Sequence, residues 1–402
     1  MHGRVRGGDA SKGAAEKEAM KDAITRKASM YSDLTALLIK MRKAGDTSRQ
    51  ALDLTAKVLR INPDYYTLWN YRREVLLAMY GGSLGLCKER MDGMACTATA
   101  DQINSEVSST GDRRISAELG STIRDQELEL SKEAIIKNPK TYSAWWHRIW
   151  IMQRFASNYE QELNLCSQFL DADQRNFHCW NYRRYVAIAG NVSPADEFQY
   201  STEKIEQNFS NYSAFHHRSV FILQLGQTNL EAKKAALAVE LAIAENATFT
   251  DPFDQSAWWY YRFLIQWMAS FLDSALSGAS LKDSNAPDGK DGRAAADTAQ
   301  QQLSLARDIC KEVLQLQVEN LSSLTEVEPQ CKWPVDALVF LLTMQRELHL
   351  KRLVTLPQEG LEHVQLQIHQ HLHRLKELDP QRVARYDYLA SYATIAPDSQ
   401  AA

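Results

Sequence analysis

Closely spaced histidines at 369–373 are the first side chains in this sequence whose pattern could do chemistry. His369, His371 and His373 alternate, so only His369 and His373 share one face of a helix. His363 is the only nearby addition, and no cysteine or acid completes a set at zinc-ligand spacing. We therefore expect a solvated polar stripe here, and no metal site in this chain.

Composition excludes several other kinds of chemistry. The 402 residues include 46 Lys and Arg against 50 Asp and Glu, so the basic footprint of a nucleic-acid-binding protein is missing. No apolar run is long enough to span a membrane, and the first residues lack the apolar stretch of a secretory signal. The six cysteines form no C-x-x-C pair and indicate free thiols, so we expect a cytoplasmic protein.

Tryptophan and arginine recur together in five segments. These segments share the pattern aromatic-x-x-Trp-x-x-Arg, with Phe215 replacing Trp once and Ser256 replacing the first aromatic once. Successive arginines are 76, 35, 35 and 44 residues apart, and a step of 35 is typical of a repeated helical hairpin. The segments are 66–72, 142–148, 177–183, 212–218 and 256–262.

The elements that position these motifs follow one order in every copy. An amphipathic helix comes first, then a break rich in Asn, Asp or Pro, then the helix that begins with the motif. Proline ends the first helix, and Asp, Ser or Asn can cap the second. The predicted first helices are 52–61, 128–137, 163–170, 200–207 and 237–245.

Repetition argues that most of these motif residues serve packing. A spacing of three places Trp and Arg on one helix face, in adjacent turns. A catalytic site occurs once in a chain, whereas a packing arrangement recurs in every repeat. We therefore expect each Trp to fill the groove between hairpins, and each Arg to bridge to a nearby acid or carbonyl.

Two weaker units extend the array, and nothing in the sequence resembles a strand ladder. They comprise residues 303–344 and 368–392, so we predict an all-α chain of about seven helical hairpins. The helical-repeat domain is expected to span 25–395, between a flexible arm at 1–24 and a tail at 396–402. Polar, Gly- and Ser-rich sequence predicts loop insertions at 81–123 and 277–298.

Seven hairpins whose second helix opens with Trp-x-x-Arg resemble the α subunits of heterodimeric protein prenyltransferases. The segments 62–76 and 375–389, and the start Met1–Arg4, are most similar to the Rab-type (type II) geranylgeranyltransferase branch. The resemblance implies a crescent-shaped right-handed α–α superhelix wrapped around a β subunit. The chain departs from animal Rab-type α chains, which add immunoglobulin-like and leucine-rich-repeat domains.

The resemblance also implies an activity and its partners. The enzyme would transfer geranylgeranyl from geranylgeranyl diphosphate to C-terminal cysteines of Rab GTPases, which an escort protein presents. Zinc would be bound by the β subunit and would hold and activate the cysteine thiolate. This chain would be the non-zinc subunit of an obligate heterodimer.

Site residues follow by matching the family motif to this sequence. Lys140, after Pro139 at the turn that enters a Trp-x-x-Arg helix, is the predicted catalytic residue that reaches the diphosphate on the β subunit. Tyr142, Asn176 and His178 are expected to line the same cleft, and Tyr212 and His216 are weaker candidates. A separate hypothesis is that His2 contacts the zinc of the partner and regulates it.

Two alternatives stay open from the sequence. The farnesyl/geranylgeranyl type-I α subunit would share the role of Lys140 and act without an escort. A non-enzymatic scaffold resembling tetratricopeptide proteins would use the helical array for binding alone. Against the scaffold, tetratricopeptide repeats carry Trp in the first helix, whereas here Trp-x-x-Arg begins the second.

Overall fold

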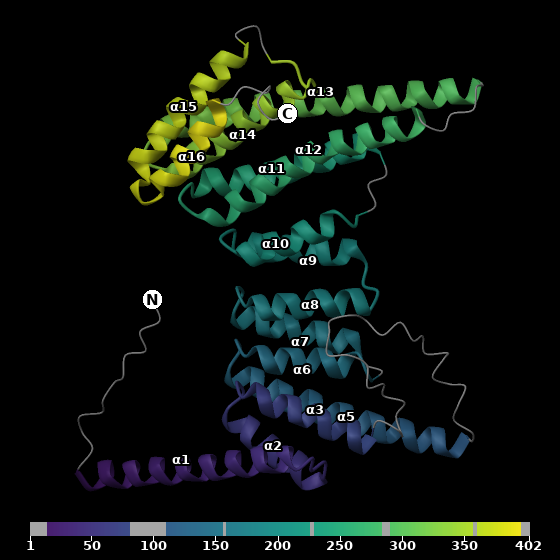
Figure 1. Cartoon of the computed structure of the whole chain (residues 1–402), viewed down its shortest axis with the longest axis vertical. Coiled ribbons are helices and arrows are strands. Elements are labelled where there is room, and N and C mark those ends of the chain that lie inside the picture. Colours follow the sequence, from purple (N-terminus) through teal and green to yellow (C-terminus); the bar gives the residue numbers. More distant parts are fainter. Residues whose placement is uncertain are drawn as a thin grey trace. The chain divides into compact units, whose positions relative to one another are not determined.

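A computed structural model describes residues 14–80, 110–155, 158–225, 229–283, 290–356 and 360–394. Every regular element in these ranges is a helix, which confirms the all-α prediction for the described residues. The chain divides into two compact units, Met1–Gly190 and Asn191–Ala402. Both are drawn in Figure 1.

In its described residues, the first unit contains one long helix followed by three helical hairpins. In Figure 1 the hairpins α2/α3, α5/α6 and α7/α8 follow one another in chain order. The helices are α1 (Ala14–Lys43), α2 (Arg49–Ile61), α3 (Tyr66–Tyr80), α5 (Thr110–Lys137), α6 (Tyr142–Met152), α7 (Tyr159–Ala172) and α8 (Phe177–Ala189).

The second unit contains four hairpins, α9/α10, α11/α12, α13/α14 and α15/α16. The described ranges of the chain therefore hold seven hairpins, as predicted. The helices are α9 (Pro194–Gln207), α10 (Tyr212–Ile222), α11 (Leu230–Thr250), α12 (Gln255–Asp283), α13 (Lys290–Val327), α14 (Lys332–Leu350), α15 (Gly360–Leu378) and α16 (Val383–Thr394), with a 3-10 turn at Pro380–Arg382 before the last.

Three predicted irregular segments are partly helical. The predicted arm at 1–24 contains the start of α1, and the predicted loops at 81–123 and 277–298 contain the start of α5 and the facing ends of α12 and α13. Their Ala, Glu, Lys, Gln and Arg residues favour helix even where few apolar side chains are available for packing. The rest of these segments, residues 1–13, 81–109 and 284–289, and the tail at 396–402 lie outside the described residues.

Each buried motif tryptophan fastens the turn before its own helix. Its indole N–H donates to the backbone carbonyl six residues earlier, over 2.8 to 2.9 Å. The carbonyls of Pro63, Pro139 and Pro252 accept a second hydrogen bond from the following turn, so neighbouring hairpins are tied together. The indole pairs are Trp69 with Pro63, Trp145 with Pro139, Trp180 with Gln174 and Trp258 with Pro252.

The first four motif arginines are buried and follow an equally regular rule. Each donates from Nη1 to the carbonyl twenty residues earlier, on the first helix of its own hairpin, and to a Ser or Thr hydroxyl one turn further. Three also form bidentate pairs with a glutamate of the next hairpin. These pairs are Arg72 with Glu127, Arg148 with Glu162 and Arg218 with Glu240.

A His or Tyr donor binds each of four buried carboxylates, three of which belong to the glutamates of these arginine pairs. It comes from the residue twenty positions after the glutamate and is a His or a Tyr, with donor–acceptor distances of 2.6 to 2.9 Å. The packing role is therefore confirmed for Trp in the first three motif copies and for Arg in the first four. The pairs are Glu127 with His147, Glu162 with Tyr182, Glu197 with His217 and Glu240 with Tyr260.

The same rule corrects the alignment of the fifth motif copy. The sequence alignment matched Trp259 to the motif Trp, but Trp258 makes the bond to the turn carbonyl and Tyr260 makes the bond to Glu240. The position equivalent to the buried arginine is therefore Tyr261, which is 1% exposed. Arg262, predicted as the motif arginine, lies one residue later and is 34% exposed.

Burial sets the charge states of the Glu127–His147 pair. Burial alone would raise the pKa of the Glu127 carboxyl, but the Arg72 guanidinium and the hydrogen bond from His147 outweigh it and lower this pKa to about 2. Burial lowers the pKa of His147 to about 4, although Glu127 opposes this effect. His147 is thus neutral at pH 7 and donates from Nε2 to Glu127.

Replacing Arg148 by Ala should destabilise the protein by roughly 3–5 kcal/mol, because it leaves the buried Glu162 without its cation. Thermal and urea unfolding measure the effect. The control is Arg60→Ala, whose pair with Glu133 is 2.6 Å long but 52% and 41% exposed. That control should cost about 1 kcal/mol or less, and equal losses in the two variants would contradict the role given to buried pairs.

His147→Tyr should reduce the acid sensitivity of the fold. A His whose folded pKa is lowered gives stability that is present above its unfolded value of 6.5 and lost as pH falls toward about 4. This lowering corresponds to roughly 3 kcal/mol at most. Tyrosine can donate to Glu127, as Tyr182 does to Glu162, and has no proton to gain. The midpoint of urea unfolding, followed from pH 7 to pH 4, should fall less steeply for this variant than for the wild type.

The matched control for this titration is His373→Tyr, since the His373 side chain is 77% exposed. It should keep the wild-type dependence on pH. If His147→Tyr and the wild type lose stability in parallel, the neutral buried imidazole is not the source of the acid sensitivity.

Candidate functional site

Lys140 lies in the turn between α5 and α6, in the first unit. The Asn138 side chain accepts a hydrogen bond from the backbone N–H of Lys140 at 3.2 Å and so shapes this turn. Pro139 ends α5, and its carbonyl accepts from Trp145 and from Asn176. Lys140 itself is exposed, and its ammonium group makes no hydrogen bond or ion pair with any described residue. The turn is thus fixed while its cation is free to bind a ligand.

Asn176 is the residue that holds this turn against the start of α8. Its Oδ1 accepts from the backbone N–H groups of His178 and Cys179, which caps the helix. Its Nδ2 donates to the carbonyl of Pro139 at 3.0 Å. Asn176 is 2% exposed, and both its amide oxygen and its amide nitrogen are hydrogen-bonded. These contacts position the turn and the start of α8, and the cleft contact predicted for Asn176 stays a prediction.

His178 lies between two aromatic rings beside Lys140. The centroid of its ring is 4.2 Å from that of Tyr142, edge to face, and 3.9 Å from that of Phe177. The residue is 6% exposed. Burial lowers the pKa of His178, and the Lys140 ammonium lowers it further. The neutral imidazole is therefore favoured, which leaves Lys140 as the cation of the cluster.

The cluster offers cationic and hydrogen-bonding groups to an anion. Tyr142 is 69% exposed, and its hydroxyl has no partner among the described residues. The structure therefore brings Lys140, Tyr142 and His178 together, with Asn176 behind them. A free ammonium and a phenol can stabilise charge that develops on a leaving oxyanion. Phe177 was missed, although its position before His178 at the start of the motif could have indicated it.

The other residues proposed from the sequence are not part of the Lys140 cluster or lie outside the described residues. Tyr212 and His216 belong to the second unit, where their rings are 6.3 Å apart and both pack on Trp259. His2 lies outside the described residues. In the ranges that the structure describes, no three His, Cys, Asp or Glu side chains are placed to hold a metal ion.

None of the helices in the described part of the chain is both long and apolar enough to cross a membrane.

Comparison with known families matches the hairpins one by one. The model described as protein prenyltransferase alpha subunit repeat matches residues 48–79, 124–155, 159–187, 194–225 and 237–268. Each matched segment covers parts of both helices of one hairpin, from α2/α3 to α11/α12.

Relatives with similar sequences carry one description. The geranylgeranyl transferase type-2 subunit alpha of Rattus norvegicus is 35% identical over 271 residues, which are 66% of this chain and 42% of that relative. The subunit of the same name from Saccharomyces cerevisiae is 29% identical over 246 residues, 59% of this chain and 64% of that relative. The chain thus spans less than half the length of the rat relative.

A solved structure shares the fold. A chain of the Candida albicans protein geranylgeranyltransferase-I complexed with GGPP superposes with a TM-score of 0.53 and 17% sequence identity, over 91% of both chains. At this identity the likeness concerns the arrangement of helices.

Lys140→Met should raise the pKa of His178, because it removes the ammonium that opposes protonation of the imidazole. The pKa should stay below 6.5, since burial of the ring is unchanged. An NMR titration of histidine-labelled protein measures it, with His178→Gln to assign the signal. Lys57→Met, at an exposed position of α2, is the control and should leave the titration unchanged. Identical curves for Lys140→Met and the wild type would mean that the two groups do not interact.

Proposed function

Since the chain belongs to the protein prenyltransferase α-subunit repeat family, we propose that it is the α subunit of a type-2 (Rab) geranylgeranyltransferase. The proposal is supported by the matched repeats and by relatives of that description at 29% to 35% identity. The observation that carries it is the free Lys140 ammonium on a fixed turn, beside Tyr142 and a neutral His178.

The reaction we propose forms a thioether on a protein cysteine. The thiolate sulfur attacks C1 of geranylgeranyl diphosphate, the bond from C1 to the diphosphate oxygen breaks, and inorganic diphosphate leaves with the bonding electrons. The substrates would be C-terminal cysteines of Rab GTPases presented by an escort protein. The β subunit would bind zinc, which lowers the pKa of the cysteine thiol and holds the thiolate.

The part of this chain in catalysis would be electrostatic. The Lys140 ammonium would pair with oxygens of the leaving diphosphate, where negative charge grows as the bond breaks. The Tyr142 hydroxyl would donate to the same group. His178 would support the Tyr142 ring by edge-to-face contact and, being neutral, would not compete with Lys140 for the anion. Asn176 would hold the turn in register with α8.

The heterodimer and its compartment belong to the same proposal. An α subunit of this family works with a β subunit, and we propose that the two form a stable complex in the cytoplasm. The buried free thiols Cys166, Cys179, Cys310 and Cys331 suit a reducing compartment.

Lys140→Ala in the co-expressed heterodimer should lower kcat roughly 100-fold, as expected when one group that stabilises transition-state charge is removed. Single-turnover transfer of geranylgeranyl to a Rab–escort complex measures it, and Lys57→Ala is the control. A rate equal to that of the wild type would remove the catalytic assignment. Transfer to a free tetrapeptide, without an escort, would favour the type-I enzyme. Absence of transfer with any β subunit would favour a scaffold.

A further inference from the structure

A second arginine follows the motif tryptophan in three of the repeats. It stands four residues after the tryptophan, so the two side chains lie on the same face of the second helix, one turn apart. The buried contacts of the first and third repeats use the arginine one position earlier. The second arginines are Arg73 after Trp69, Arg184 after Trp180 and Arg262 after Trp258.

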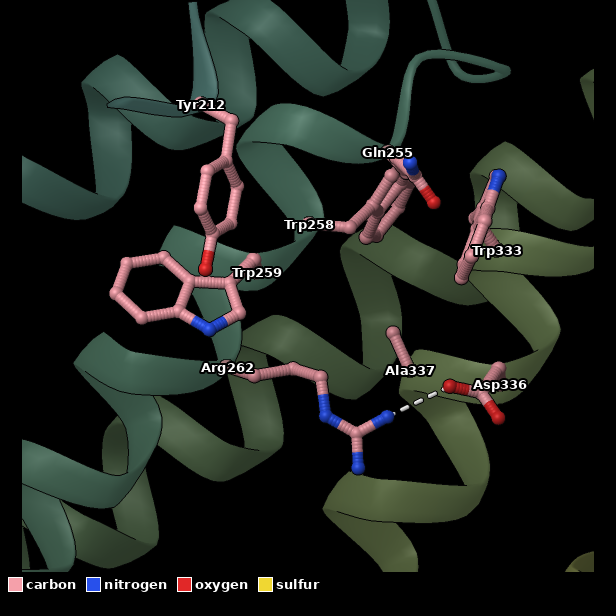
Figure 2. Close-up of a pocket in the computed structure, with 8 residues that line it drawn as sticks. All are labelled: Tyr212, Gln255, Trp258, Trp259, Arg262, Trp333, Asp336 and Ala337. Carbon is pink, nitrogen blue, oxygen red and sulfur yellow. Dashed lines mark hydrogen bonds and ion pairs between the residues drawn. The ribbon is translucent and has the colours of Figure 1, made fainter. Parts of the chain in front are cut away.

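Two of these second arginines have ordinary surroundings. Arg262 forms an ion pair with Asp336, with Nη1 2.6 Å from Oδ2, and Figure 2 shows its guanidinium directed toward this carboxylate. Arg262 and Asp336 are the charged residues that line the surrounding groove of about 300 Å³, so the charges of this groove balance. Arg184 is partly exposed to water and donates to the side chain of Asn181.

Arg73 differs from both because it is buried without an anion. The residue is 8% exposed. Its Nη2 donates to Asn70 Oδ1, but its Nη1 is buried and has no hydrogen-bond partner among the described residues. The carboxylate of the adjacent Glu74 is already occupied, since its two oxygens accept from Arg42 at 2.6 and 3.0 Å. An unpaired buried guanidinium costs free energy, so this nitrogen is suited to an anion from outside the described chain.

A second guanidinium approaches Arg73 from the facing helix. The rings of Trp69 on α3 and His147 on α6 are 4.7 Å apart, and His147 stacks on Trp150. Arg154 follows on the same side, with its guanidinium carbon 4.5 Å from the centroid of the Trp150 ring. As second helices of consecutive repeats, α3 and α6 run in the same direction, so Arg73 and Arg154 lie beyond the same ring contact. Burial lowers the pKa of Arg73 to about 10, and the charge of Arg154 lowers it further, which shows that the two groups are close.

We infer that Arg73 and Arg154 bind a small oxyanion of the phosphate class between α3 and α6. The Nη1 of Arg73 would donate to one oxygen, and Arg154 would donate to another from the facing helix. A phosphate group carries about −1.5 to −2 charge at pH 7 and has oxygens in tetrahedral directions, so it can accept from two guanidinium groups at once. A carboxylate has only two oxygens in one plane, which suits a single guanidinium better.

Helix α6 separates this site from the turn of Lys140. Lys140 comes before the first residue of the helix, Arg154 follows its last, and 11 helical residues span roughly 16 Å. The bound ion would fasten the first hairpin to the second at the end of α6 that is remote from Lys140. Such a site would be present whether or not the chain takes part in prenyl transfer.

Isothermal titration of the full chain with inorganic phosphate, in chloride buffer at constant ionic strength, tests the site. Arg73→Gln and Arg154→Gln should each weaken binding about 10-fold, because each removes a charge-assisted hydrogen bond. Arg184→Gln is the matched control, since Arg184 has the same place in the third repeat and donates to an equivalent asparagine. It should change the affinity less than about 2-fold, because distant sites act independently.

Melting curves separate binding from folding. Phosphate at about ten times its dissociation constant should raise the melting temperature of the wild type and of Arg184→Gln, because it binds only the folded state. It should leave the melting temperature of Arg73→Met unchanged. Each protein is compared with itself with and without the ion, so a change in stability caused by the substitution does not affect the result.

Two further anions define the ligand. A site for the free ion should bind inorganic phosphate at least about 10-fold more tightly than glycerol 3-phosphate, whereas equal affinities would assign it to the phosphate group of a larger ligand. Acetate supplies a carboxylate and should stabilise the chain less than phosphate does. No phosphate binding, binding that Arg73→Gln leaves unchanged, or equal stabilisation by acetate would overturn the inference.

Discussion

A buried guanidinium that reaches from one hairpin into the next is the constraint on which each unit depends. The arginine near the start of a second helix satisfies a carbonyl and a hydroxyl of its own hairpin, and in three copies it also neutralises a glutamate of the following one. An unpaired charge in this interior would be costly, so partner and geometry must be supplied together. The spacing between successive helices is thereby fixed by chemistry as well as by apolar packing.

The fixed helices also hold the turns between them in defined positions. Because the second helix is held in place, the indole of Trp145 and the amide of Asn176 meet at the carbonyl of Pro139. The next residue, Lys140, can then remain exposed without losing its position. A cation on an ordinary surface loop would have to be immobilised when a ligand binds. Here the backbone that carries it is already ordered by packing beneath it.

Much of the architecture could be predicted from the sequence, because its signals are local and repeated. Proline and asparagine breaks between apolar-periodic segments indicated all seven hairpins of the described residues. The fifth motif was misaligned because the run Trp258–Arg262 has two tryptophans and two tyrosines before its arginine. Only contacts with Pro252 and Glu240 decide which of them are buried. The helical parts of the segments predicted to be irregular, such as the start of α5, were not predicted, because polar helix-forming residues give no periodic apolar signal.

For the candidate site, the residue types could be proposed from the sequence. Which of them are exposed to a ligand, and which hold the turn in place, could not. Lys140, Tyr142 and His178 lie close together, but nothing in the sequence shows that the Asn176 amide caps α8 and donates to the Pro139 carbonyl. The lowered pKa of His178 likewise depends on burial between rings from two helices.

Phe215 replaces the tryptophan in the fourth copy of the motif, and this replacement affects the turn before α10. It fills its place in the core with 0% exposure, but a phenyl ring has no N–H to give to the turn between α9 and α10. That turn has the hydrogen bond from Ser256 to the carbonyl of Ser210 but no indole bond of the kind that Trp69, Trp145 and Trp258 make. Local opening of a fold starts where the fewest hydrogen bonds must be broken. Amide hydrogens of this turn should therefore exchange with solvent sooner than those of the turns that Trp69, Trp145 and Trp258 close.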